Sequence, residues 1–217
     1  MPDYAEQRFH MVVSQVLASG VTNERILAAM RKIERERFVP TAKRPIAYAE
    51  AAVEVVARRY LIDPRNFALM LEAAELSVSD KVLDVGCATG YSTAVLSELV
   101  ARVVGLEQDA DLVRIAGEMM QALDVKNAVI VQGSLADGFR PEARYDVIFV
   151  NGGIEIAPRA LLAQLAEGGR LVAVVGVPGQ TRATVYVNEN GRIGHRVAFD
   201  ASVPALVGFR QPVGFVF

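Results

Sequence analysis

The sequence predicts an α/β fold in which a helical N-terminal segment precedes an open parallel sheet with an antiparallel edge. From Lys81 onward, short apolar runs alternate with segments of helical spacing, which is the order that parallel βαβ units produce. Before Lys81, apolar residues recur mainly at helical spacing. Near the C-terminus, two further apolar runs enclose Asn190-Gly191, a dipeptide typical of a two-residue hairpin turn.

The N-terminal segment is expected to be mostly helical. Residues 5–35 have the spacing of two helices, interrupted at Gly20, and residues 66–76 return to that spacing. Residues 41–66 show no clean period. Within them, residues 47–57 are expected as a further helix.

The parallel sheet is expected to contain five strands. They lie at 82–85, 103–106, 128–131, 147–150 and 171–175, with helices at 91–100, 109–123 and 158–166. The strands of the hairpin are expected at about 183–188 and 192–199.

Length and charge limit the classes of function. The chain has 217 residues, 52% of them hydrophobic, and fits a single domain over residues 1–217. Residues 1–76 would form a cap or substrate segment, and residues 77–217 the α/β core. A net charge of −2 without a basic block gives no long-range attraction to nucleic acid or to an anionic membrane, so neither is expected as a partner.

Other signals bear on the kinds of site and on location. Cys87 is the only cysteine, so no intramolecular disulfide can form. His10 and His195 lie far apart without a ligand pattern, so no metal site is expected. The N-terminus lacks the basic start and apolar run of a signal peptide, and no uncharged apolar run is long enough to span a bilayer. A cytoplasmic location is therefore expected.

The end of the first core strand carries the main functional signal. It reads Asp84-Val85-Gly86-Cys87-Ala88-Thr89-Gly90, and ligands of open α/β sheets bind at such strand ends. Gly86 and Gly90 allow a tight turn close to a ligand, and the helix that follows has free N–H groups for a carboxylate. Asp84 can accept hydrogen bonds from an ammonium group. The turn therefore suits the amino-acid end of a methionine-like ligand.

A second acid ends the next strand. Glu107 follows the turn by about 20 residues, where an acid meets the ribose hydroxyls of an adenosine-containing ligand. A dinucleotide is the rival ligand, but its fingerprint is G-x-G-x-x-G and this turn reads G-x-x-x-G. An ordinary strand-to-helix turn with an incidental acid is the other alternative. Asp84, both glycines and Glu107 together favour binding of S-adenosylmethionine.

With these residues in place, the sequence resembles the protein-L-isoaspartate O-methyltransferase family over most of its length. Residues 20–30 and the run Arg37-Phe38-Val39-Pro40 are similar to the family's N-terminal helix pair. Residues 82–96 are similar to its cofactor motif. Residues 145–150 and 160–172 are similar to its fourth and fifth strands and the helix between them.

The resemblance implies a Rossmann-like class I S-adenosylmethionine-dependent methyltransferase sheet with an N-terminal helical segment and a C-terminal antiparallel hairpin. It also implies methyl transfer to the free carboxylate of an isoaspartyl residue, with a protein or peptide as partner. A carboxylate is already a nucleophile at pH 7, so catalysis would consist mostly of positioning. The cofactor residues that the turn, the second acid and the resemblance imply are Asp84, Gly86, Cys87, Ala88, Thr89, Gly90, Glu107, Gln108, Gly133, Ser134, Leu135 and Asn151.

The chain departs from the family in the substrate segment. Where the family has a Gly-Gln-Thr-Ile-Ser-Gln-Pro-like run, this chain reads Arg58-Arg59-Tyr60-Leu61-Ile62-Asp63-Pro64. Ile62 stands at the position of the hydroxyl that orients the substrate, and isoleucine cannot hydrogen-bond a carboxylate. The candidates to replace that hydroxyl are Tyr60, Arg59 and Arg65, because an arginine fork binds a carboxylate well.

Three further departures follow along the chain. The family's Gly-Asp-Gly becomes Gly133-Ser134-Leu135, which leaves Ser134 or Asp137 as acceptor for the adenine amine. Asn151-Gly152-Gly153 replaces Thr-Ala-Ala, and residues 208–217 lack the family's closing strand motif.

These departures leave two classes of function open. The first is an active carboxyl methyltransferase that acts on proteins or peptides. The second is a cofactor-binding member without isoaspartyl repair activity, with a different substrate or a role as a sensor or a partner in an assembly. The apolar face that includes Phe9, Val13 and Val16 fits either a cap over the active site or a homodimer interface.

Overall fold

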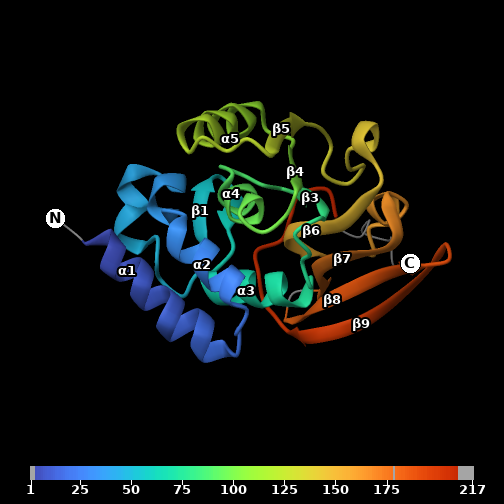
Figure 1. Ribbon diagram of the computed structural model, residues 1–217, viewed down its shortest axis with the longest axis horizontal. Helices are drawn as coiled ribbons and strands as arrows, with labels where there is room; N and C mark the ends of the chain where they lie inside the picture. The colour runs from blue at the N-terminus through green and yellow to red at the C-terminus, as the bar shows by residue number, and fades with distance from the viewer. Residues whose placement is uncertain (1–2, 178, 210–217) are drawn as a thin grey trace, which may run out of the picture.

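The computed structural model describes residues 3–177 and 179–209 and has a seven-stranded sheet at its centre (Figure 1). The strand order is β5-β4-β3-β6-β7-β8-β9. The strands are β3 (Lys81–Val85), β4 (Arg102–Glu107), β5 (Ala128–Gln132), β6 (Tyr145–Ile154), β7 (Leu165–Val177), β8 (Gln180–Glu189) and β9 (Arg192–Asp200). The first five strands in this order are parallel, and β8 and β9 form the antiparallel hairpin. The predicted fold class is confirmed.

The order of the strands fixes where a ligand would bind. From β3 the chain moves outward through β4 to β5, and it then returns to place β6 on the other side of β3. Ligands of open α/β sheets bind at such a reversal, outside the carboxyl ends of the strands. A ligand site is therefore expected at the carboxyl ends of β3, β4 and β6.

Helices flank the sheet and make up much of the N-terminal segment. The helices are α1 (Tyr4–Met11), continued by a π turn (Val12–Val16) and a 3₁₀ turn (Leu17–Ser19), and α2 (Glu24–Lys32), α3 (Pro64–Ala73), α4 (Tyr91–Ser97), α5 (Ala110–Ala122) and α6 (Arg159–Leu162). Short 3₁₀ turns lie at Arg35–Phe38, Thr41–Ile46 and Arg140–Glu142. The helix expected at 158–166 is shorter than predicted, because β7 already begins at Leu165.

The prediction of a helix at residues 47–57 is wrong. Val53–Val56 forms β1, which pairs antiparallel with β2 (Arg59–Leu61) in a separate two-stranded sheet. Val53 and Val55 are buried and the residues after each are more exposed, so the period is two rather than 3.6. Branched side chains on a half-buried surface favour this strand over a helix.

The N-terminal segment packs against the core next to the glycine turn. Phe67 of α3 contacts the ring of Tyr91 in α4 and the ring of Phe149 in β6, with centroids 5.6 and 5.7 Å apart. Buried residues of both segments belong to one hydrophobic cluster. Because α3 follows β2 directly, this packing holds β2 close to the carboxyl ends of the strands.

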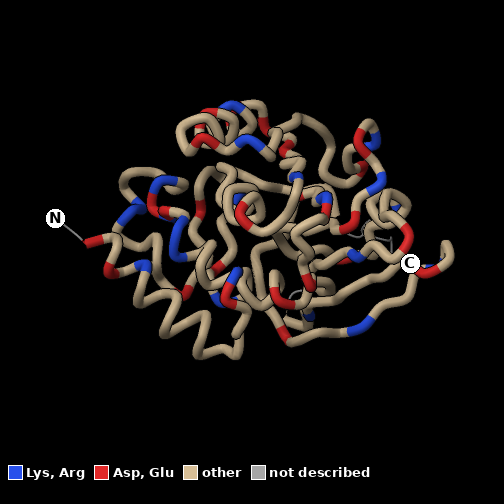
Figure 2. Tube along the Cα trace, viewed as in Figure 1, with Lys and Arg blue, Asp and Glu red and all other residues tan. Residues whose placement is uncertain are grey.

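Charges are mixed over the surface rather than segregated. Figure 2 shows acidic and basic residues interspersed along the helices and strands. Within residues 3–177 and 179–209, no helix has the length and apolar character needed to cross a membrane. No group of three or more potential metal ligands occurs in the same described residues.

Candidate cofactor and substrate site

The glycine turn after β3 has the conformation that its sequence predicts. Gly86 and Gly90 have φ values of 78° and 94°, in the left-handed region that favours glycine. The Gly86 amide donates to the carbonyl of Leu106 at 2.8 Å, which ties the turn to β4. A Cβ atom on Gly90 would lie 3.2 Å from both the Ala116 Cβ and the Met120 Cε of α5. The turn is therefore fixed by close packing against α5.

Asp84 is fully buried and held by three side chains. Ser92 and Thr93 of α4 donate to its Oδ2 atom at 2.7 and 2.6 Å, and the Asn151 amide donates to Oδ1. Burial raises the pKa of this carboxyl from 3.8 to about 6, although the three hydrogen bonds oppose the shift. The structure thus brings together Asp84 and Asn151, two of the predicted cofactor residues.

Glu107, at the end of β4, is also fully buried and accepts several hydrogen bonds. The Ala88 amide donates to Oε2 at 2.9 Å, and the amides of Gln108 and Asp109 donate to Oε1 at 2.8 and 3.2 Å. These backbone donors stabilise a charged carboxylate beside the glycine turn. Each oxygen also accepts from a side chain of the N-terminal segment.

That side chain is Arg59 of β2. Its Nη1 donates to Glu107 Oε1 at 3.0 Å, and its Nη2 donates to Oε2 at 2.6 Å. Nη2 also donates to the carbonyl of Gly86 at 3.1 Å. The side chains of the pair are 7% and 0% exposed, so it is a buried bidentate ion pair. Arg59, which was predicted to orient the substrate, thus binds Glu107, which was predicted to bind the cofactor.

A second residue covers the turn from the C-terminal side. The segment after β9 returns to the sheet (red in Figure 1), where Leu206 donates its amide to Gly153 and Gly153 donates to Pro204, both at 2.8 Å. A Cβ on Gly86 would lie 3.0 Å from Leu206 Cδ1, and one on Gly152 would lie 2.9 Å from Leu206 Cβ. Leu206 therefore packs directly against the backbone of the two strand ends.

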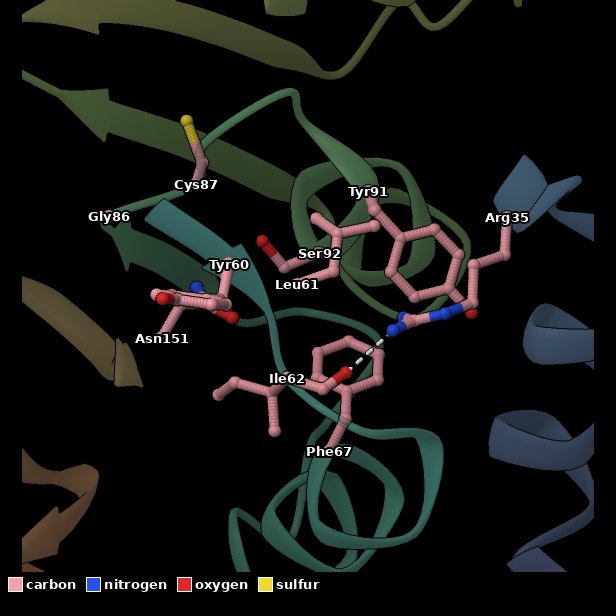
Figure 3. A pocket seen from close by; sticks show the side chains of 10 residues that line it. All are labelled: Arg35, Tyr60, Leu61, Ile62, Phe67, Gly86, Cys87, Tyr91, Ser92 and Asn151. Carbon is pink, nitrogen blue, oxygen red and sulfur yellow. Dashed lines mark hydrogen bonds between the residues drawn. The ribbon is translucent and has the colours of Figure 1, made fainter. Parts of the chain in front are cut away.

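A small cavity lies next to the glycine turn, between it and the N-terminal segment. Its volume of about 10 Å³ is room for about one water molecule. It is lined by Arg35, Tyr60, Leu61, Ile62, Phe67, Gly86, Cys87, Tyr91, Ser92 and Asn151, with Tyr60 and Asn151 at one side and Arg35 and Tyr91 at the other (Figure 3). Pockets for drug-sized ligands are typically 300–1,000 Å³, so this conformation is closed.

The residues predicted to orient a substrate lie in different places. Tyr60 is partly exposed and lines the cavity beside the buried Ile62. Ile62 presents an apolar side chain at the position where the resemblance leads us to expect a hydroxyl. Arg59 lies on Glu107, and Arg65 is exposed on α3 away from the residues that line the cavity.

The sequence interpretation missed Arg35, which is fully buried at the cavity wall. Its Nε donates to the Ala47 carbonyl at 2.8 Å and its Nη2 to the Ile62 carbonyl at 2.7 Å. Its guanidinium carbon lies 4.8 Å from the centre of the Tyr91 ring, and burial lowers the pKa of Arg35. Arg35 lies in a run of four charged residues, which by itself reads as a solvated segment, so no sequence signal separated it from its neighbours.

The other predicted cofactor residues lie around the same edge. The Gly133 amide donates to the Glu107 carbonyl at 2.9 Å, Leu135 is buried, and Ser134 and Asp137 are exposed. Gln108 is exposed next to Glu107. The departure predicted at the C-terminus lies, from Arg210 onward, outside the described residues.

Two residues of the turn face inward. Thr89 donates its hydroxyl to the Phe38 carbonyl at 2.7 Å, which links the turn to the N-terminal segment. Cys87 is buried, and burial raises the pKa of its thiol well above the usual value, so it remains an unreactive thiol that fills space.

The reversed strand order, the glycine turn and the two buried acids on adjacent strands define the class of protein. They are the arrangement of a Rossmann-like class I methyltransferase, in which the acid of the second strand meets a ribose. Comparisons with known proteins then give the family.

The chain belongs to the protein-L-isoaspartate(D-aspartate) O-methyltransferase family, whose sequence profile matches residues 7–204. It is 36% identical over 205 residues to a protein-L-isoaspartate O-methyltransferase of Koribacter versatilis (strain Ellin345), covering 94% of this chain and 92% of that one. It is 37% identical over 187 residues to the corresponding protein of Methanoculleus marisnigri (strain ATCC 35101 / DSM 1498 / JR1), covering 86% and 85%. Members of the family are S-adenosylmethionine-dependent carboxyl methyltransferases.

Solved structures agree on the fold. A protein-L-isoaspartate O-methyltransferase matches with a TM-score of 0.80 and 24% identity, over 93% of this chain and 66% of that one. A second one, from Plasmodium falciparum and described in complex with S-adenosyl-L-homocysteine, matches with a TM-score of 0.78 and 20% identity, over 95% and 99%. At these identities the comparison establishes the fold alone.

The polar groups of the edge fit the family's cofactor. Glu107 offers two carboxylate oxygens for a diol, and Asp84 offers a buried acceptor next to the turn. The space next to these groups is occupied, however, because the Arg59 guanidinium contacts Glu107 and the Leu206 side chain packs against Gly86.

Proposed function

We propose that this chain is an S-adenosylmethionine-dependent carboxyl methyltransferase that acts on isoaspartyl residues of proteins or peptides. The observation that carries the proposal is the pair of buried acids, Asp84 and Glu107, at adjacent strand ends of a chain that matches the family over residues 7–204. Glu107 would hold the ribose hydroxyls, and the turn 86–90 would lie along the amino-acid end. Asn151 would keep Asp84 in place from β6.

The chemistry requires little of the protein beyond positioning. When bound, the cofactor would supply an electrophilic methyl group to the acceptor carboxylate, which is already a nucleophile at pH 7. No proton moves, so no general base is needed. The protein's task is to hold the carboxylate in line and to exclude water. Tyr60 is the hydroxyl-bearing residue of β2 that lines the cavity and is the proposed orienting group.

A second function has a specific observation in its favour. Ile62 replaces the orienting hydroxyl, and Arg59 engages the ribose acid. A cofactor-binding family member without isoaspartyl repair activity, with a different substrate or a sensing role, would tolerate both changes. Methyl transfer and cofactor binding must therefore be measured separately.

The test is transfer of a labelled methyl group to an isoaspartyl peptide, scored as a base-labile ester. The aspartyl peptide of the same sequence is the control. We expect transfer to the isoaspartyl peptide alone, and Ile62→Ser should raise kcat/KM by roughly tenfold, because one hydrogen bond to a charged group contributes about 1.5–3 kcal/mol. Ile62→Val, which removes a methyl group without adding a hydroxyl, is the matched control. No ester in any variant, with cofactor bound, would favour the second function.

Pairing of two copies through the N-terminal helices remains a proposal. Phe9, Val13 and Leu17 recur at helical spacing and are 53%, 38% and 41% exposed, whereas Val12 and Val16 are buried. Val16 of the predicted face thus packs inward, and Leu17 takes its place outside. Phe9→Glu should shift a dimer to monomer in sedimentation. The cytoplasmic location, the single-domain division and the lack of nucleic-acid and membrane partners also remain predictions.

A further inference from the structure

The contact between Arg59 and Glu107 has the pattern expected of a bound nucleoside. Two parallel N–H donors of the guanidinium face the two oxygens of one carboxylate, at 3.0 and 2.6 Å. A ribose with two adjacent hydroxyls would present two donors to the same two oxygens. The backbone donors from Ala88, Gln108 and Asp109 reach those oxygens from other directions and would be kept in either case.

The rest of the expected cofactor path is covered by an apolar side chain. Leu206 lies over Gly86 and Gly152, the glycines at the ends of β3 and β6. The Arg59 Nη2 atom also binds the Gly86 carbonyl, so the polar and apolar groups meet over the same residue. The cavity of about 10 Å³ lies beside them and is lined by other residues, among them Gly86 and Cys87.

We propose that Arg59 is an internal substitute for the ribose, so that cofactor binding is a competition between the nucleoside and this chain's own guanidinium for Glu107. This proposal rests on the proposed function, since it concerns the same cofactor. It makes Arg59 a residue that sets cofactor affinity rather than one that orients the substrate. The chain at rest is then closed, and the cofactor binds the fraction of molecules in which Arg59 has left Glu107.

The two covering groups lie on parts of the chain that can withdraw without breaking the main sheet. Arg59 belongs to the two-stranded sheet of β1 and β2, which is separate from the seven-stranded sheet. Leu206 lies on the segment after β9, which meets β6 through an isolated bridge between Gly153 and Ala205. Withdrawal of the Leu206 segment would break its backbone hydrogen bonds to Gly153 of β6, but neither movement breaks a bond between strands of the seven-stranded sheet.

The consequence for affinity follows from the population of open molecules. When the competent form is a small fraction of the total, the apparent Kd rises by the inverse of that fraction. A form populated at about 1% would weaken binding about 100-fold. Removing the guanidinium should therefore tighten binding, the reverse of what loss of a ligand contact would do.

The experiment is titration calorimetry of S-adenosylhomocysteine with the full chain and with Arg59→Gln. Glutamine restores the residue of the family's run and keeps one hydrogen-bond donor for Glu107. We expect the variant to bind at least about tenfold more tightly than the original protein. Arg58→Gln is the matched control, because Arg58 is exposed one residue away and, among the described residues, hydrogen-bonds only through its backbone amide, to Glu54. Equal or weaker binding by Arg59→Gln would overturn the proposal.

Two further measurements cover the case in which Arg59→Gln folds poorly. Arg59→Lys keeps the charge but loses the bidentate fork, so its affinity should lie between those of the original protein and the glutamine variant. In the unmodified protein, the ligand should increase amide hydrogen exchange in residues 57–61, because β2 loses the contact between Arg59 and Glu107. Protection of those amides on binding would contradict the competition.

These outcomes separate the two proposals. Tight binding by Arg59→Gln, together with no methyl transfer by the original protein, would contradict the isoaspartyl function and leave the competition intact. Transfer by the original protein, with affinity unaffected by Arg59→Gln, would contradict the competition and leave the function intact.

Discussion

The two sides of the site differ in what holds them. On the cofactor side, Asp84, Glu107 and the glycine turn belong to strands and helices of the central sheet, and their partners are mostly backbone amides or residues of α4 and β6. On the substrate side, Arg59, Tyr60 and Ile62 follow the turn of a small hairpin. By the resemblance, the first side keeps the glycine turn and both acids and departs at Ser134, whereas the second side loses its orienting hydroxyl at Ile62. A short hairpin can change sequence without disturbing the sheet. Here one of its residues, Arg59, binds Glu107 on the cofactor side.

The strongest test of this contrast is removal of the acid that the two sides share. Glu107→Ala should lower the free energy of unfolding by about 3–5 kcal/mol, because it leaves the Arg59 charge buried without its partner. Urea denaturation would measure the change. The control is Glu118→Ala, which breaks an exposed pair with Arg114 and should cost less than about 1 kcal/mol. A cost below 1 kcal/mol for Glu107→Ala would mean that the two sides are not coupled through this pair.

The pKa of Asp84 provides a test confined to the cofactor side. Folding raises it from 3.8 to about 6, so folding disfavours the ionised form. The contribution of Asp84 to stability is therefore fully present below pH 3.8 and is lost as the pH rises through about 6. One pKa unit corresponds to about 1.4 kcal/mol, so the total loss is about 3 kcal/mol.

Asp84→Asn is the reference for this test because asparagine does not titrate. The free energy of unfolding of the original protein, measured relative to that variant, should fall by about 2.4 kcal/mol between pH 4 and pH 7. A difference that stays constant over this range would show that burial does not raise the pKa of Asp84. The closed form would then place no cost on the ionised carboxyl.

The same contrast separates what the sequence predicts from what it does not. The five parallel strands and the hairpin around Asn190-Gly191 depend on local period and turn chemistry, and both were predicted correctly. The helix at 47–57 failed because the burial of alternate residues in β1 depends on tertiary packing, which overrides local propensity. Asp84 and Glu107 could be predicted to lie side by side at the sheet edge because turn and strand order place them without reference to distant residues.

The closure of the site could not be predicted in this way. Arg59 and Glu107 are separated by 48 positions, and their contact depends on the register of β1 with β2 and on the packing of α3. Leu206 reaches Gly86 only because the chain returns to β6 after the hairpin. An arginine in a polar connector carries no local sign of burial, so its role emerges only in three dimensions.

The smallest expected effect concerns how tightly the cofactor side is packed. Gly90→Ala should destabilise the protein by roughly 1–3 kcal/mol, because position 90 has a φ of 94° and the new Cβ would lie 3.2 Å from Ala116. Gly117→Ala is the matched control on α5, the helix against which the turn packs, with no atom within 4 Å of its Cβ, and should stabilise by about 0.5–1 kcal/mol. Thermal unfolding would therefore move in opposite directions for two identical substitutions. If both substitutions stabilise the protein, the glycine turn can adjust to α5 and is not rigid. If their effects have opposite signs, the turn is rigid, and the parts of the site that move are the hairpin of β1 and β2 and the segment that carries Leu206.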